Sequence, residues 1–194
     1  LRVNPLGLLR HVDGPFLFFH IFLMNIQSLY RKGEQHLLLD GVAGTLEAIL
    51  QCPAESHSNY LAILGHPHSL YGGTMQNKVV TTLARAFQDL GIPSLRFNFR
   101  GVGQSQGAYD AGIGESDDML FLMKELLKDT PHLRFCLAGF SFGSYVTFRA
   151  AAKNTEHVQC LVSIAPAVQH YDFDEFKGFS LPWVVVQGEA DDIA

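Results

Sequence analysis

Residues 139–143, which read Gly-Phe-Ser-Phe-Gly, constrain the fold more than any other stretch of this chain. The apolar run at residues 133–137 before them is typical of a buried strand, and residues 144–152 after them are typical of a helix. A Gly-x-Ser-x-Gly between a strand and a helix predicts a tight turn from which the serine hydroxyl projects. Side chains at Gly139 and Gly143 would collide with neighbouring backbone, so glycine is expected at both positions.

The turn places Ser141 where it can act as a nucleophile. The helix that follows aims its backbone N–H groups at the serine, where negative charge would develop on a substrate oxygen. Acyl transfer by serine also needs a histidine base, an acid that orients the histidine, and two N–H donors for the oxyanion. The backbone N–H of Phe142, directly after the serine, is the expected first donor.

Strands and helices alternate from residue 60 onward, after a hairpin expected at residues 37–50. The expected strands are 60–65, 94–99, 133–137, 158–164 and 183–187, and the expected helices are 76–90, 115–128 and 144–152. This alternation predicts an α/β fold, a three-layer α/β/α sandwich around a mostly parallel sheet. In such sheets the active site lies at the carboxyl ends of the strands, so the loops after the strands hold the remaining candidates.

Two of these loops supply candidates. The loop after the strand at residues 60–65 begins His-Pro-His, and because Pro67 has no N–H, His68 is the expected second oxyanion donor. The last expected strand is followed by Gly-Glu-Ala-Asp-Asp, in which Asp191 is the candidate acid and Asp192 the alternative.

The histidine base has no candidate in the expected order, because all nine histidines precede Asp191. His170 follows the strand at residues 158–164 and is the candidate base within this sequence, although a histidine there is more often a surface residue. We expect His66 and His68 to shape the oxyanion loop instead.

Four stretches in this order resemble the α/β-hydrolases, and among them the small, capless bacterial group related to dienelactone hydrolases. They are residues 65–75, 97–107, 139–143 and 188–191. The resemblance covers residues 35–194 and implies a Ser141–Asp191–His triad that hydrolyses ester or related acyl bonds of a small-molecule substrate. No cofactor is expected for this chemistry.

The chain departs from the family pattern because it lacks the final strand, the triad histidine and the last helix. We therefore expect a hydrolase domain that is incomplete at its C-terminus and has an exposed sheet edge prone to aggregation. The alternative is a catalytically inactive fragment or a binding protein. Residues 165–181 are too few for a lid of several helices, which favours an open site for small esters. The aromatic residues of this loop are candidates for an acyl pocket or for packing: Tyr171, Phe173, Phe176 and Phe179.

Two other kinds of site fit poorly. A dinucleotide fingerprint would need its third glycine at position 106, where this chain has glutamine, and Gly107 comes one residue late. His66 and His68 lack a further ligand at position 70, which is leucine, and no His-Glu-x-x-His or Cys-x-x-Cys is present. No metal site is expected.

Length and composition predict one globular domain, with 47% hydrophobic residues and a net charge of −5. Without a basic run, neither nucleic acid nor a membrane is an expected partner. The three cysteines Cys52, Cys136 and Cys160 form no disulfide pattern, which favours a reducing, cytoplasmic location. Cys136 and Cys160 are expected to be inert core residues.

Residues 1–34 read as an N-terminal extension. Residues 15–24 are strongly apolar but too short to span a bilayer, and no small-residue cleavage site follows them as it would in a signal peptide. We expect Met24 to be the natural start, with a peripheral membrane anchor as the alternative role of this stretch.

Overall fold

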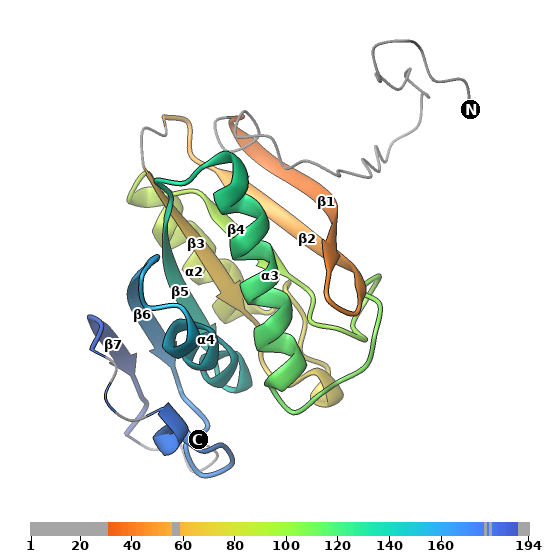
Figure 1. Cartoon of the computed structure of the whole chain (residues 1–194), viewed down its shortest axis with the longest axis vertical. Helices are drawn as coiled ribbons and strands as arrows, with labels where there is room; N and C mark the ends of the chain where they lie inside the picture. Colours follow the sequence, from red (N-terminus) through yellow and green to blue (C-terminus); the bar gives the residue numbers. More distant parts are fainter. Residues whose placement is uncertain (1–30, 56–58, 177, 179, 190–194) are drawn as a thin grey trace.

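A seven-stranded sheet, in the order β1-β2-β4-β3-β5-β6-β7, forms the centre of the molecule (Figure 1). The computed structural model describes residues 31–55, 59–176, 178 and 180–189. The strands are β1 (Gly33–Gly41), β2 (Gly44–Cys52), β3 (Tyr60–Gly65), β4 (Ser94–Phe97), β5 (Arg134–Phe140), β6 (Val158–Ile164) and β7 (Trp183–Val186). The helices are α2 (Lys78–Asp89), α3 (Ile113–Asp129) and α4 (Phe142–Lys153), with short 3-10 helices η1 (Ser69–Tyr71) and η2 (Phe173–Phe176).

The sheet is mostly parallel, as the alternation of elements predicted. β1 pairs with β2 and β2 with β4 in antiparallel fashion, whereas β4, β3, β5, β6 and β7 are parallel neighbours. β1 begins two residues before the boundary expected at residue 35, while the expected start at Met24 lies outside the described residues. Because β3 and β5 pair Gly65 with Gly139, the loops that follow these two strands leave the sheet side by side.

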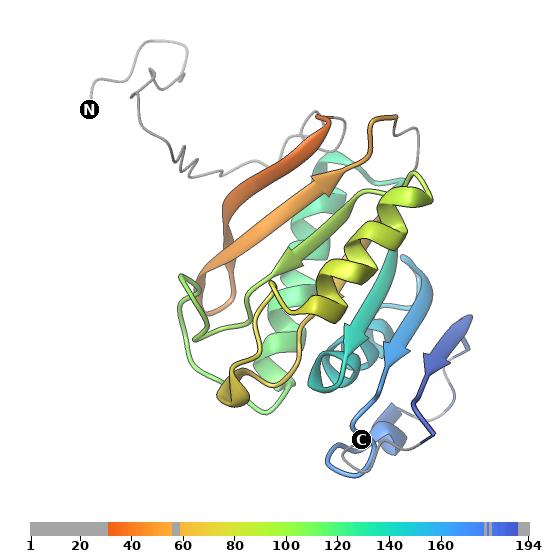
Figure 2. The ribbon, with the colours of Figure 1, turned by 180° about the vertical axis from the view of Figure 1, so that it is seen from behind.

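Helices cover both faces of the sheet, which confirms the three-layer fold. α3 and α4 lie on the face turned toward the viewer in Figure 1, and α2 lies on the opposite face, as Figure 2 shows. The larger buried cluster lies beneath α3 and α4 and includes Leu137 and Phe148, whereas α2 contributes Val80 and Ala84 to a smaller cluster. No helix in the described part of the chain is long and apolar enough to cross a membrane.

The helix boundaries follow local capping chemistry. α2 begins after Asn77, whose side-chain oxygen accepts a hydrogen bond from the Val79 N–H at 2.9 Å. It ends before Gly91, which has a φ of 74°. α3 begins two residues earlier than expected because the Glu115 carboxylate accepts a hydrogen bond from the Gly112 N–H at 2.9 Å.

The edge strand β7 exposes apolar side chains on both of its faces. Trp183 is 41% exposed, and Val184 and Val186 are 56% and 52% exposed. Among the described strands β7 pairs only with β6, so no described strand pairs with the backbone groups of its other edge. An uncharged, apolar edge of this kind is a template for pairing with another chain.

We therefore expect the purified chain to self-associate through β7, and Val184→Lys to reduce that association, because a charge on an edge strand opposes pairing. Light scattering coupled to size-exclusion chromatography over a dilution series measures the effect. Val42→Lys is the matched control, since Val42 is 59% exposed in the β1–β2 turn at the opposite edge. A monomer at every concentration would show that the β7 edge does not mediate self-association.

Candidate active site

Ser141 occupies a strained turn between β5 and α4. Its φ is 53° and its ψ is −120°, a conformation that residues other than glycine rarely adopt. A Cβ at Gly139 would lie 2.2 Å from the Gly143 carbonyl oxygen, and a Cβ at Gly143 would lie 2.3 Å from the Gly65 carbonyl oxygen. Glycine is required at both positions because α4 begins almost in contact with the ends of β3 and β5.

Hydrogen bonds to β6 hold this turn in place. The Ser141 N–H donates to the Ile164 carbonyl at 2.9 Å. The buried Ser144 hydroxyl lies 2.9 Å from the Gly139 carbonyl and 3.2 Å from that of Ile164. The half-buried Ser141 hydroxyl has no hydrogen-bond partner among the described residues and is left for a ligand. Phe142 is the first residue of α4, so its N–H has no acceptor within the helix.

A second loop lies beside this turn and is held by the buried imidazole of His66. Nε2 accepts a hydrogen bond from the Phe99 N–H at 2.9 Å, and Nδ1 lies 2.6 Å from the Pro67 carbonyl oxygen. These partners assign the proton to Nδ1. Burial lowers the pKa of His66 to about 4, so the ring is neutral near neutral pH. His66 thus joins the start of the loop to the chain after β4.

His68 lies next to Phe142, and the centroids of the two rings are 5.1 Å apart. The His68 carbonyl accepts hydrogen bonds from the N–H groups of Tyr71, at 3.1 Å, and Gly73, at 3.0 Å. The His68 backbone N–H has no partner among the described residues. Its Nδ1 accepts from the Leu70 N–H at 3.2 Å, so the imidazole caps η1. The structure therefore brings together the two residues from which the sequence predicted oxyanion donors.

Of the candidate acids and the candidate base, the structure describes only the base, His170. Asp191 and Asp192 lie outside the described residues. β7, which leads toward them, ends at Val186 in register with Ile164, the residue that accepts the Ser141 N–H. His170 is an exposed residue of the turn after β6, and its imidazole has no hydrogen bond to a described residue.

The aromatic side chains of the loop after β6 pack on α4. The Tyr171 ring lies 5.3 Å from that of Phe142, and the Phe173 ring lies 5.0 Å from that of Phe148. An ion pair between Arg149 and Glu175 holds the same loop against the helix. These contacts favour a packing role for Tyr171 and Phe173. The side chains of the other two pocket candidates, Phe176 and Phe179, lie outside the described residues.

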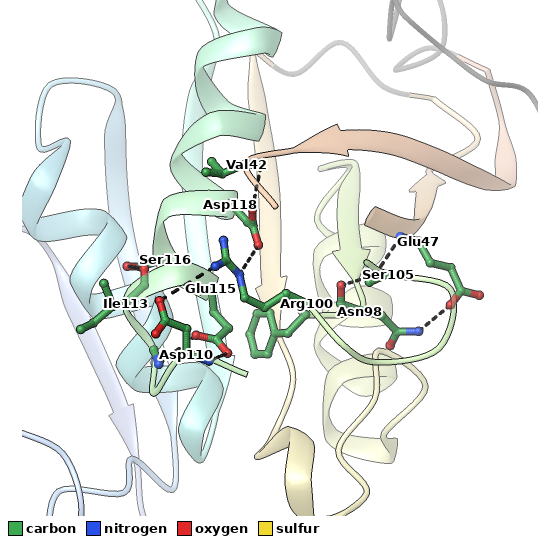
Figure 3. Close-up of polar contacts among 12 residues, drawn as sticks. Val42, Glu47, Asn98, Arg100, Ser105, Asp110, Ile113, Glu115, Ser116 and Asp118 are labelled. Atoms are coloured by element: carbon green, nitrogen blue, oxygen red, sulfur yellow. Dashed lines mark hydrogen bonds and ion pairs between the residues drawn. The ribbon is translucent and has the colours of Figure 1, made fainter. Parts of the chain in front are cut away.

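The structure adds a polar network that the sequence analysis missed, shown in Figure 3. Asn98 follows β4; its side-chain amide donates to Glu47 at 2.8 Å and accepts from the Met75 N–H at 2.9 Å. The Ser105 hydroxyl donates to the Asn98 carbonyl at 2.6 Å. Asn98 therefore connects the end of the loop that carries His68 to strand β2.

A buried ion pair lies beside this network (Figure 3). Arg100 Nε donates to Asp118 at 2.8 Å, and the fully buried Asp118 also accepts from the Val42 N–H at 2.8 Å. A Cβ at Gly114 would lie 2.0 Å from the Arg100 guanidinium, so glycine leaves room for it. Residues 97–107, which include Arg100 and the glycines after it, entered the sequence analysis only through the family resemblance and the dinucleotide fingerprint, and Asp118 was assigned no role there.

His66 makes the stability of the fold sensitive to acid. Because its pKa is about 4 when folded and 6.5 when exposed, the unfolded chain binds a proton first as the pH falls. The stability that depends on neutral His66 is complete above pH 6.5 and is lost as the pH falls through 4, by about 3 kcal/mol in total. His66→Gln keeps an acceptor for the Phe99 N–H and cannot titrate, so urea unfolding of this variant should lack that loss.

The exposed His36 provides the control. His36→Gln removes an imidazole but leaves His66 in place, so this variant should retain the acid loss that His66 contributes. Parallel pH profiles for His66→Gln and the wild type would refute the role of burial at His66.

Comparisons with known proteins agree with this geometry. Residues 66–189 match the family described as the alpha/beta hydrolase fold. The chain is 40% identical to an alpha-beta serine hydrolase homologue from Coxiella burnetii, with a TM-score of 0.78 over 84% of this chain and 78% of the other. It is 43% identical to a serine hydrolase without a lid from Xanthomonas campestris, with a TM-score of 0.76 over 85% and 75%.

A curated relative, an uncharacterized protein of Rickettsia prowazekii, is 34% identical over 161 residues, which are 81% of this chain and 67% of the relative. The chain belongs to the α/β hydrolase fold family. The expected resemblance to α/β-hydrolases is therefore confirmed, and these relationships support a hydrolase function with a small-molecule substrate.

Proposed function

We propose that this protein is a serine hydrolase that cleaves ester or related acyl bonds of small substrates through an acyl-enzyme on Ser141. The observation that carries the proposal is the backbone of Ser141, held at φ 53° between two glycines at the start of α4. The contact between His68 and Phe142 supports it, because each residue carries a backbone N–H without an acceptor in its own element.

In the first step, the Ser141 oxygen attacks the substrate carbonyl carbon and its proton passes to a histidine base. The N–H groups of Phe142 and His68 stabilise the negative oxygen that forms. The alcohol then leaves with the proton from the histidine. Water, with the same histidine as its base, then hydrolyses the acyl-serine. Asp191 is proposed to orient the base. In Ser–Asp–His order the base follows the acid; His170, the candidate within this sequence, precedes Asp191 and so departs from that order.

A catalytically inactive binding protein is the second candidate function. One observation favours it: no histidine among the described residues forms a hydrogen bond with the Ser141 hydroxyl. Without a base, turnover would fall to the residual level that the oxyanion donors and substrate binding sustain.

The size of the substrate follows from the loop after β6. Because Tyr171 and Phe173 pack on α4, the described part of this loop does not form a lid of its own. The Xanthomonas relative, a serine hydrolase without a lid, supports the same interpretation. Small soluble esters are therefore the proposed substrates.

The assignment of the acid can be tested with p-nitrophenyl acetate as the substrate. Asp191→Asn should lower kcat by about 10⁴-fold, because the histidine then adopts the wrong tautomer. Asp192→Asn is the matched control and should change kcat by less than about threefold, as expected for a solvated loop carboxylate away from the reacting groups. A large loss of kcat in Asp192→Asn but not in Asp191→Asn would identify Asp192 as the acid. Equally small losses in both variants would contradict the proposed triad.

A further inference from the structure

Cys136 and Cys160 lie opposite one another on neighbouring parallel strands. β5 and β6 pair in register at these two residues. Neighbouring strands lie about 4.8 Å apart, which is within the Cα separation of about 4.4–6.8 Å that a disulfide can bridge. Both side chains belong to the apolar cluster on the α2 face of the sheet, so the two thiols point in the same direction.

An irregularity in the pairing creates this arrangement. Phe135 pairs with Val158, but the next residue, Cys136, pairs with Cys160 rather than with Gln159. The extra residue on β6 is a β-bulge. In regular pairing Gln159 would face Cys136, and Cys160 would point to the opposite face of the sheet because side chains alternate along a strand. The bulge therefore brings the second thiol to the first.

The two thiols differ in their access to solvent. Cys136 is 5% exposed, whereas Cys160 is half-buried. Figure 2 shows α2 on this face of the sheet, with the β6–β7 side of the face beyond it. Of the two residues, Cys160 is therefore the more accessible to a small solute, because it is only half-buried whereas Cys136 is buried.

The chemistry of the pair also favours reaction at Cys160. A hydrogen bond from the Cys136 thiol stabilises the Cys160 thiolate and lowers the pKa of Cys160. The same hydrogen bond, together with burial, raises the pKa of Cys136. The more exposed thiol is thus the one that ionises first, and the thiolate is the form that reacts with oxidants.

We propose that Cys136 and Cys160 form a redox-sensitive dithiol that a peroxide converts into an intramolecular disulfide. The Cys160 thiolate attacks one oxygen of hydrogen peroxide and becomes a sulfenic acid, and the other oxygen leaves as water once protonated. The Cys136 sulfur then attacks the Cys160 sulfur, the S–S bond forms, and the sulfenic oxygen leaves as a second water. Two thiols are oxidised and one peroxide is reduced, so the step is balanced. The pair then has a role other than that of inert core residues.

Cys52 provides an internal reference for this reaction. It is buried on β2, and strands β4 and β3 separate it from β5 in the sheet. Burial raises the pKa of Cys52 to about 11, so little thiolate is available there near neutral pH.

The test is peptide mapping under non-reducing conditions after the purified chain has been exposed to hydrogen peroxide. We expect a linked peptide that contains Cys136 and Cys160 and that dithiothreitol separates. One of the three cysteine thiols, that of Cys52, should still react with a maleimide after unfolding. Cys52→Ala should form the same link. In Cys136→Ser, Cys160 should stop at a sulfenic acid that dimedone traps.

Three results would overturn the proposal. They are a wild-type Cys160 that is oxidised without a linked peptide, three thiols that survive peroxide, and a link that involves Cys52. The wild-type map alone decides these outcomes, so the test stands even where a cysteine variant fails to fold.

Discussion

Replacing Ser141 with alanine is expected to lower kcat/KM for ester hydrolysis by about 10⁴-fold or more, because no other group can form the acyl intermediate. The change should leave the melting temperature nearly unchanged. The Ser141 hydroxyl has no hydrogen bond to a described residue, and its backbone N–H, which donates to Ile164, is kept in alanine. Steady-state hydrolysis of p-nitrophenyl acetate and a thermal melt measure the two effects.

Ser144, three residues later, is the matched control. Its hydroxyl is buried and lies within hydrogen-bond distance of the carbonyls of Gly139 and Ile164. Ser144→Ala should therefore reduce the free energy of unfolding by about 1 kcal/mol while it retains most of the activity. Equal losses of activity in the two variants would mean that Ser141 contributes only to the shape of the turn.

Replacing Gly143 with alanine is expected to reduce the free energy of unfolding by about 3 kcal/mol or more, because the added methyl has no room. Its Cβ would lie 2.3 Å from the Gly65 carbonyl oxygen and 2.6 Å from that of His66. Both contacts are with backbone, so no side chain can move aside. The turn can accept the methyl only if α4 separates from β3, which would also displace the proposed oxyanion donors. Urea unfolding measures the loss.

Gly72→Ala is the matched control, which tests the effect of backbone conformation without the steric clash. It has a φ of 79°, and a Cβ there would meet no atom within 4 Å. Gly72→Ala should therefore reduce the free energy of unfolding by only about 1 kcal/mol, the cost of holding alanine in a left-handed backbone conformation. If Gly143→Ala were no more destabilising than Gly72→Ala, the close approach of α4 to β3 would not constrain the site.

The sequence predicted those parts of the fold that depend on local pattern. The apolar runs gave the bounds of β3 and β6 correctly, because a buried parallel strand is apolar on both faces. The glycines around Ser141 were predictable because the motif fixes both the turn and the helix that follows it. The missing N–H of Pro67 predicted His68 as the second oxyanion donor, which stays a prediction, and the structure places the His68 ring against Phe142.

Features that depend on contacts between distant segments were not predictable. Glu47 and Asn98 are 51 residues apart and meet only because β2 and β4 pair. Asp118 lies on α3 and Arg100 follows β4, so only the fold brings this buried pair together. The register of Cys136 with Cys160 depends on one extra residue in β6, and the spacing of apolar residues along the strand does not reveal a bulge.

The most direct test of the central claim is labelling of Ser141 by a fluorophosphonate, read out by mass spectrometry of the modified peptide. Two proteins should be compared: the present sequence, and the same sequence continued through the codons that follow residue 194 in its gene. Ser141→Ala serves as the blank for both. We expect the adduct to map to Ser141 in at least one of them and to be absent from the blank. Labelling of both would be followed by His170→Ala, to test His170 as the base. Folded protein that is unlabelled at Ser141 in both forms would show that Ser141 is not an activated nucleophile.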